Sequence, residues 1–410
     1  MNDFMARRSE LDLDLYVIET FQFETDIDPE EAAIHLCQEQ STAQWKRVDV
    51  DEDFRIRYGA KLLNLKTVGE KSYVAEIAQP HINFGTKIPN LLTTVCGEGV
   101  FYSPAISTIK LLDLEFPESY LKEFQGPQFG VQGVRDLLNI HNRPIFLGVV
   151  KPNIGLDPKG FAELAYQSWL GGLDAPKDDE MLADTAYSPL AERTKLLGAL
   201  RKKAEQETGE KKMFIANITD EVDRIQELHD IAVQNGVNAV MLNAWTTGLS
   251  AARVLRKKAK VPMVSHFDFV AAFSRIPNFG MSERLAIKLQ RLAGFDMIIF
   301  AGLSPRMKTT EAEMLSHVRA CLEPWGNIKP ALPVPGGSDW AGTLPSLFEK
   351  IGHADFGMVP GRGVFNHPAG PSAGAKSFRQ AWEAIQQGIT LNEFAKTHVE
   401  LKQAIEAFGN

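Results

Sequence analysis

From about residue 143 onward, short apolar runs alternate with longer amphipathic stretches. Each apolar run ends in Gly, Pro, Asn or Asp, and roughly 12–18 residues with helical periodicity follow it. Continuous apolar runs, as opposed to alternating ones, are typical of strands that are buried on both faces. We expect strands at 145–150, 172–175, 213–216, 239–242, 262–265, 297–300, 331–334 and 356–359.

The amphipathic stretches supply a helix after each of these strands. We expect helices at 161–170, 190–208, 221–234, 249–258, 283–292, 311–322, 344–351 and 373–387, with a last helix over 391–408. Eight β/α units over about 245 residues match a (β/α)₈ TIM barrel in number and length. An open doubly wound sheet is the rival architecture, but it usually has fewer strands. We assign the barrel domain to residues 126–410.

The first 125 residues lack this regular alternation. An apolar run at 15–18 leads to a helix start at Asp28-Pro29, where proline occupies the first turn and acidic residues follow it. Strand-like segments follow at 54–64, 72–78 and 107–116. Mixed strands and helices predict a smaller α+β domain over residues 1–125.

Composition narrows the class of partners. The 410 residues carry 44 Lys and Arg against 52 Asp and Glu, a net charge of −8, and 44% of them are hydrophobic. This balance excludes general disorder and disfavours binding to nucleic acid or to an anionic membrane. We see no apolar run of about 18 residues, no signal peptide and only three scattered cysteines. We therefore expect a cytoplasmic protein.

Polar side chains follow one predicted strand after another. Catalytic residues of such barrels come from the carboxyl ends of the strands. The sequence therefore predicts a site at this end of the barrel. The polar residues concerned are Lys151, residues 177–180, Asn217, Thr219, Asn243, His266, Asp268, Arg306, Lys308, residues 336–338 and residues 361–363.

The tetrad KDDE at 177–180 is the densest of these groups. Positions 177 and 179 point the same way on an extended chain, and Glu180 joins them only if the strand ends there. Two carboxylates suit an oxygen-seeking ion such as Mg²⁺. A neutral lysine amine between them could take up CO₂ as a carbamate and add an anionic oxygen ligand. A charged surface turn is the ordinary alternative for these four residues alone.

Four segments together resemble the RuBisCO large subunit superfamily. They are GGLDAPKDDE at 171–180, GVVKPNIGL at 148–156, the GRG…HP…G pattern of 361–370, and an N-terminal segment with Glu39, Ser41, Thr42 and Trp45. The resemblance covers about residues 15–405. It implies a ferredoxin-like α+β domain followed by a TIM barrel.

The resemblance also implies roles for individual residues. Lys177 would be the carbamylated lysine, with Asp179 and Glu180 as the other Mg²⁺ ligands. Lys151 would transfer the proton, and His266 matches a catalytic histidine. Gly336, Gly337, Gly361 and Gly363 would bind phosphate, and glycine there lets backbone amides close on an anion. Arg362 either binds phosphate or forms a structural salt bridge. Glu39 would complete the site of a neighbouring subunit, which implies a homodimer at least.

Several positions depart from the pattern of the family's carboxylases. Asn153 replaces a second lysine, and Glu98 stands near a metal-proximal asparagine. The lid lysine has no clean match, with Arg306 and Lys308 as the candidates. Apolar residues replace an arginine, two histidines and a serine at Phe267, Val270, Phe300 and Pro335. These losses remove charge-assisted donors around a second phosphate and an acid near the carboxylation centre.

The chain therefore resembles the RuBisCO-like proteins, the type IV, non-carboxylating branch. Residues 97–102 and 359–365 resemble the group from photosynthetic bacteria. We expect an Mg²⁺-dependent enolase or isomerase that acts on a phosphorylated ketose or thio-sugar phosphate without fixing CO₂, with sulfur metabolism implied by the subgroup. Glu98 would be a carboxylate base, a partner of Lys151 or the metal, or half of an ion pair between subunits.

Two other functions stay open from the sequence. A non-catalytic regulatory or stress-response protein could keep the metal site without converting any substrate. Mutational drift in such a protein, however, would have no reason to leave all three metal ligands unchanged. An aldolase-like enzyme could use Lys151 or Lys177 as a Schiff base, which borohydride trapping would reveal.

Overall fold

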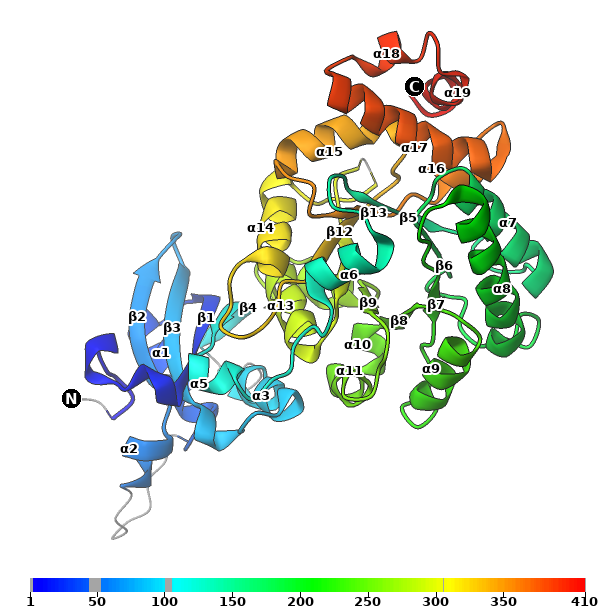
Figure 1. The fold of residues 1–410 in the computed structure, drawn as a ribbon. Helices are drawn as coiled ribbons and strands as arrows, with labels where there is room; N and C mark the ends of the chain where they lie inside the picture. Colours follow the sequence, from blue (N-terminus) through cyan, green and yellow to red (C-terminus); the bar gives the residue numbers. More distant parts are fainter. Residues whose placement is uncertain (1–2, 44–52, 100–104, 305, 410) are drawn as a thin grey trace. The chain divides into compact units, whose positions relative to one another are not determined.

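The computed structural model describes residues 3–43, 53–99, 105–304 and 306–409. They form two compact units (Figure 1). The first unit comprises Met1–Gln125 with Phe269–Leu289 and Trp325–Ile328, and the second comprises Gly126–Asp268, Gln290–Pro324 and Lys329–Asn410. The division that we drew at residue 125 placed both shorter segments in the barrel domain.

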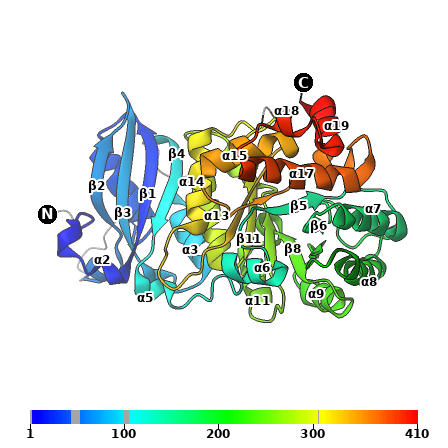
Figure 2. The ribbon, with the colours of Figure 1, turned by 45° about the horizontal axis from the view of Figure 1, so that its top comes forward.

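A five-stranded sheet forms the first unit, in the order β10-β4-β1-β3-β2. Figure 2 shows β4, β1, β3 and β2 side by side in this order. Neighbouring strands run antiparallel except β10, which pairs with β4 in parallel. The strands are β1 (Tyr16–Thr25), β2 (Lys61–Thr67), β3 (Ser72–Pro80), β4 (Ile106–Glu115) and β10 (Gly280–Met281). The helices of this part are α1 (Pro29–Glu39), α2 (Phe54–Tyr58), α3 (Ile88–Val95), α5 (Glu118–Leu121) and α12 (Val270–Ser274).

Local signals predicted α1 correctly but not α2. Asp28 caps α1 by accepting hydrogen bonds from the backbone N–H groups of Glu30 and Glu31 at 3.0 Å. The strand expected at 54–64 is wrong for its first half, which is helical. Arg55 of α2 is buried, and its guanidinium donates to the carbonyl oxygen of Ala43 at 2.6 Å. This contact between segments leaves no trace in local periodicity.

Eight parallel strands form the second unit, in the order β12-β11-β9-β8-β7-β6-β5-β13. The last strand also lies against the first, so the sheet curls into a barrel (Figure 1). The predicted (β/α)₈ fold is confirmed, and a strand occurs near each expected position, but the strand expected at 172–175 begins only at Ala175 and runs to Lys177, because residues 172–174 form the turn before it. The strands are β5 (Ile145–Val149), β6 (Ala175–Lys177), β7 (Ile215–Asn217), β8 (Ala239–Asn243), β9 (Met263–His266), β11 (Met297–Ala301), β12 (Leu332–Gly336) and β13 (Gly357–Met358).

The predicted helices are present, with one correction at the end of the chain. The helix expected over 391–408 is broken into α18 (Leu391–Phe394) and α19 (Val399–Phe408). His398 has an extended backbone, and its ring stacks on Phe394 with centroids 3.8 Å apart. The others are α6 (Gly130–Leu138), α7 (Pro158–Leu170), α8 (Leu190–Thr208), α9 (Ile225–Gln234), α10 (Ala244–Thr247), α11 (Leu249–Arg256), α13 (Glu283–Ala293), α14 (Glu311–Leu322), α15 (Leu344–Ile351), α16 (Arg362–Phe365) and α17 (Gly370–Gln387).

Apolar side chains from the strands fill the barrel. This core includes Leu147, Ile215, Met241, Val264, Ile299 and Val334, all buried. A packed interior leaves the strand ends as the places where polar groups can gather. No helix among the described residues is long and apolar enough to cross a membrane.

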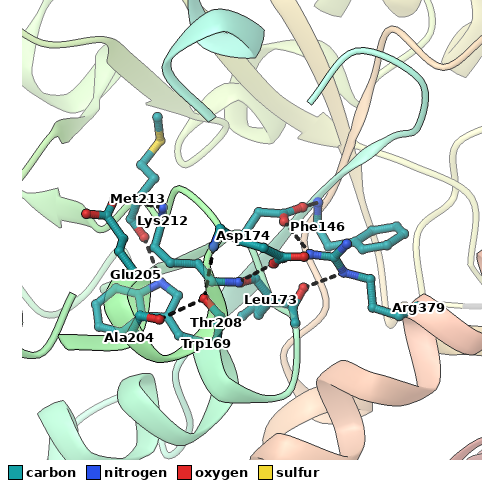
Figure 3. Close-up of polar contacts among 12 residues, drawn as sticks. Phe146, Trp169, Leu173, Asp174, Ala204, Glu205, Thr208, Lys212, Met213 and Arg379 are labelled. Carbon is teal, nitrogen blue, oxygen red and sulfur yellow. Dashed lines mark hydrogen bonds and ion pairs between the residues drawn. The ribbon is translucent and has the colours of Figure 1, made fainter. Parts of the chain in front are cut away.

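A buried carboxylate closes the amino-terminal end of β6 (Figure 3). Asp174 accepts hydrogen bonds from Arg143 at 2.6 and 2.7 Å, from the Phe146 backbone N–H at 2.7 Å, and from Arg379 at 3.1 Å. Burial opposes ionisation of Asp174, but Arg143 and the neighbouring cations outweigh it and lower its pKa to about 2. This ion pair therefore joins β5, β6 and α17 at the closed end of the barrel.

Replacing Asp174 should destabilise the barrel strongly. Asp174→Asn leaves the buried guanidinium of Arg143 without its anion, and we expect the free energy of unfolding to fall by about 3–5 kcal/mol. Asp355→Asn is the matched control, because Asp355 is half exposed and Arg135 keeps backbone acceptors; it should cost under about 1 kcal/mol. The folded pKa of Asp174 lies below its ordinary 3.8, so its contribution is complete above about pH 4 and is lost toward pH 2. Urea unfolding of the wild type and both variants between pH 2 and 7 checks this; equal losses in the two variants would contradict it.

Candidate functional site

The tetrad at 177–180 begins on the last residue of β6 and continues into the turn after it. Lys177, Asp178 and Asp179 are fully buried, and Glu180 is partly exposed. A solvated surface turn is therefore excluded. Charged groups that are withdrawn from water to this degree must be paired, or must bind something that pairs them.

Lys177 lies among three acids. Its Nζ donates to the Asp178 carbonyl oxygen at 2.7 Å and lies 3.5 Å from Oε2 of Glu180. Burial lowers the pKa of Lys177, although Glu180, Asp179 and Asp178 oppose this by attracting the charged form. The buried position therefore favours the neutral amine more than water does, and a neutral amine is the form that reacts with CO₂.

Lys151 follows β5 and forms an ion pair with the second acid of the tetrad. Its Nζ lies 2.9 Å from Oδ2 of Asp179. The loop after β13 leaves room for this side chain, because a Cβ added at Gly361 would lie 2.8 Å from Cε of Lys151. The structure thus brings the predicted proton-transfer lysine, a predicted metal ligand and a predicted phosphate-loop glycine together.

A second chain of contacts leads from Glu180 to the end of β9. Oε2 of Glu180 lies 3.4 Å from Nε2 of His266, and Nδ1 of His266 lies 3.1 Å from Oδ2 of Asp268. Burial raises the pKa of Glu180, but Lys177 and His266 outweigh it and lower that pKa to about 2. Glu180, His266 and Asp268 offer donor atoms within 4.8 Å of one another, a spacing that a metal ion could bridge.

The sequence identified Asp268 only as one polar residue at a strand end. The structure places it beside His266. The sequence signal that could have identified this pair was the two-residue spacing of His266 and Asp268, because alternate residues of an extended segment point to the same side.

A shell of hydrogen bonds fixes the backbone of the tetrad. Nδ2 of Asn217 donates to the carbonyl oxygens of Asp179 at 3.2 Å and Glu180 at 2.9 Å, and Nδ2 of Asn243 donates to the latter at 3.1 Å. The Oδ1 atom of Asn243 is buried, and no group in the described part of the chain donates a hydrogen bond to it. These amides hold the two acids in place without occupying their carboxylates.

Asp178 points to the other side and pairs with Arg193 of α8. The two atom pairs are 3.0 and 3.1 Å apart, and the backbone N–H of Asn217 donates to Oδ2 of Asp178 at 2.8 Å. Burial raises the pKa of Asp178 despite the opposing charge of Arg193. Sequence reasoning missed Arg193, because nothing in α8 marks one arginine as the buried partner of a distant turn.

The two glycine pairs lie where the segments after β12 and β13 approach each other closely. Gly336 is the last residue of β12 and Gly337 follows it, whereas Gly361 precedes α16 and Gly363 is the second residue of that helix. A Cβ added at Gly363 would lie 2.5 Å from the carbonyl oxygen of Asp339, and one added at Gly337 would lie 3.2 Å from Cγ of Met307. Arg362 is exposed, with its guanidinium carbon 5.3 Å from the Phe408 ring centroid. Asn153 is half-buried, whereas Arg306 and Lys308 are both exposed.

Two predicted residues belong to the first unit. Glu39 ends α1, and Glu98 is exposed in the turn after α3. A Cβ added at Gly99 would lie 3.3 Å from Cβ of Glu39, so the two segments are neighbours. Trp45 and residues 100–102, which also carried the resemblance, lie outside the described residues.

Comparison with known proteins identifies the family of this chain. Residues 9–120 match the N-terminal domain, and residues 130–408 the catalytic domain, of the ribulose bisphosphate carboxylase large chain. The chain belongs to the RuBisCO large-chain family. It is 57% identical to the "Ribulose bisphosphate carboxylase-like protein 2" of Rhodopseudomonas palustris, over 99% of this chain and 98% of that protein. It is 54% identical to the "Ribulose bisphosphate carboxylase-like protein" of Chlorobaculum tepidum, over 98% and 96%.

Solved structures of the RuBisCO family share the fold. The octameric Rubisco of Pyrococcus horikoshii superposes with a TM-score of 0.94 at 32% identity, over 99% of this chain and 96% of that one. A rubisco-like protein (MtnW) from Alicyclobacillus acidocaldarius gives 0.87 at 26%, over 96% and 99%. The resemblance to RuBisCO-like proteins that we drew from the sequence is confirmed.

Asn217 should hold the tetrad turn locally. Asn217→Ala removes the two hydrogen bonds that Nδ2 donates to carbonyl oxygens and the two that Oδ1 accepts from Thr219, and we expect a loss of about 1–3 kcal/mol in the free energy of unfolding. Amide hydrogen exchange at residues 178–182 should become faster. Asn235→Ala is the matched control, because Nδ2 of Asn235 also donates two hydrogen bonds, to Ala191 and Thr194. Unchanged exchange at 178–182 in Asn217→Ala would contradict this role.

Proposed function

We propose that this RuBisCO-family chain is an Mg²⁺-dependent enolase or isomerase that moves a proton α to a carbonyl of a phosphorylated ketose or thio-sugar phosphate. The observation that supports this most is the group of Lys151, Lys177, Asp179 and Glu180 at the mouth of the barrel, in which Lys177 and Asp179 are buried and Lys151 and Glu180 are partly exposed. Two amines lie against two carboxylates there, so proton carriers and metal ligands share one site.

The residues at this site fit a hard dication. Asp179 and Glu180 offer carboxylate oxygens, a carbamate on Lys177 would add a third, and His266 and Asp268 border the same space. The buried acceptor Oδ1 of Asn243 also has no hydrogen-bond donor among the described residues. When bound, Mg²⁺ would polarise the substrate carbonyl and so make the α-proton more acidic.

Lys151 is the proposed proton carrier. Asp179 holds its ammonium group 2.9 Å away, which orients Nζ into the mouth of the barrel. Once Lys151 has released a proton to water, its neutral amine can accept the proton that leaves the α-carbon of the substrate, and the resulting ammonium can return a proton to a different carbon. His266 is the second candidate, since both of its ring nitrogens face carboxylates.

Apolar substitutions support proton transfer without carboxylation. Phe267 stacks on His266 with centroids 4.6 Å apart, and Phe300 is buried against His317. Neither side chain can donate a hydrogen bond to a phosphate. Asn153 likewise carries no charge near Lys151, so the second cation that the carboxylases use is missing.

The active species is proposed to be a homodimer or a larger homo-oligomer. Solved relatives include Rubiscos whose descriptions call them dimeric, from Hyperthermus butylicus, and octameric, from Pyrococcus horikoshii. Glu39 and Glu98 lie on neighbouring segments of the first unit, as expected if both reach the site of a partner subunit. The glycine loops at Gly336, Gly337, Gly361 and Gly363 would bind the phosphate of the substrate.

Deuterium exchange tests the reaction class. In D₂O with Mg²⁺ and bicarbonate, the wild-type protein should exchange an α-hydrogen of one ketose phosphate in a panel, with no carboxylated product. Lys151→Met should lower this rate at least about 100-fold, because general base catalysis contributes that much. Lys159→Met, an exposed lysine on α7, is the control and should change nothing. Exchange by Lys151→Met at the wild-type rate would refute its role, and silence across the panel would favour the regulatory alternative.

A carbamate should form on Lys177 and on no other lysine at the site. With ¹³C-bicarbonate and Mg²⁺, carbon NMR should show one carbamate resonance that Lys177→Arg lacks. Lys151→Arg is the matched control and should retain it, because the ammonium of Lys151 is held by Asp179. A resonance that persists in Lys177→Arg would contradict the assignment.

A further inference from the structure

The loop after β12 contains a buried acid that the proposed reaction does not use. Asp339 is 5% exposed, and burial raises its pKa to about 7, with the Gly337 backbone N–H opposing the shift slightly. That N–H donates to Oδ2 of Asp339 at 3.3 Å. The carboxyl group of Asp339 therefore accepts a hydrogen bond from a backbone amide on the loop that we propose binds an anion.

Among the described residues, those that line the cavity beside Asp339 include no compensating cation. A cavity of about 250 Å³ adjoins it, and its lining carries apolar or hydroxyl side chains and one further glycine. Apart from Asp339 and that glycine, the lining residues are Leu303, Pro335, Thr343, Ser346 and Leu347. Asp339 is the single ionisable member of this lining. A carboxylate in such a place is costly, whereas a neutral acid is not.

The elements packed around Asp339 direct their charges elsewhere. They are the 302–308 segment, β12, α15 and α16, with Lys151 close to Gly361. Of the ionisable side chains described in these segments, four are exposed, namely Arg306, Lys308, Glu349 and Arg362. Lys350 is paired with Glu311, and Lys151 is paired with Asp179.

We propose that Asp339 determines whether the β12 loop admits an anion. As a neutral acid, Asp339 releases the Gly337 amide and can donate its own O–H to an anionic oxygen. As a carboxylate, it keeps the amide and repels the anion. The inference rests on the proposed phosphate role of Gly337, and it makes that role dependent on one proton.

Only protonated Asp339 is competent to admit the anion, so the apparent dissociation constant should rise as the competent fraction falls. For a group that titrates near pH 7, this fraction falls about 20-fold between pH 6.5 and 8.5. A neutral side chain of the same shape should remove the dependence.

Sulfate is the probe, because its charge does not change over this range, unlike that of inorganic phosphate. Titration calorimetry on the full chain should show sulfate binding that weakens about 20-fold from pH 6.5 to 8.5. Asp339→Asn should bind sulfate at pH 8.5 about as tightly as the wild type does at pH 6.5. Asp339→Ser, which is smaller and neutral, should do the same and guards against an effect of the asparagine amide alone.

Glu349→Gln is the charge-matched control. Glu349 is an exposed acid on α15, and its replacement should leave the pH dependence of the wild type intact. Equal sulfate binding by the wild type and both Asp339 variants at pH 8.5 overturns the proposal, as does a lack of sulfate binding by both variants. Neither result depends on turnover, so failure here is distinguishable from failure of the enolase assignment, which the deuterium exchange reports.

Discussion

The burial of charge at the two ends of β6 is the constraint on which the rest of the barrel depends. This strand has three residues, and an acid that water cannot reach stands just outside each end. An unpaired buried carboxylate is too costly to keep, so each end must recruit partners from other elements. The partners differ, and the difference separates the structural end from the functional end.

At the amino-terminal end the charges are matched within the chain. Asp174 receives two hydrogen bonds from Arg143, one from Arg379 and one from a backbone amide. At the carboxyl end, Arg193 matches Asp178 in the same way, but Asp179 and Glu180 are compensated by amines, at 2.9 and 3.5 Å. An amine can be released by proton transfer or by carbamylation, whereas a guanidinium cannot. This asymmetry suits a barrel whose stability and chemistry reside at opposite ends.

The same reasoning connects the tetrad to the glycine loops. Gly361 lets Lys151 reach Asp179, and Gly363 lets the loop after β13 touch the loop that carries Asp339. The buried Asp179 thus pairs with a lysine, whereas the hydrogen bond described for the buried Asp339 is a long one from a backbone N–H. Metal binding and anion binding would each replace an interaction that the chain makes with itself.

The sequence by itself determined the eight β/α units and the members of the tetrad, because buried parallel strands and ligand spacing are local patterns. It also located His266 and Lys151 at strand ends. It could not decide the helical start of the 54–64 segment, the break between α18 and α19, or the pairing of Asp178 with Arg193. It left Asp268 and Asp339 without a role. Those features depend on which side chain from a distant part of the sequence packs into a space or pairs with a charge. Only the folded chain brings such partners within a few ångströms of each other.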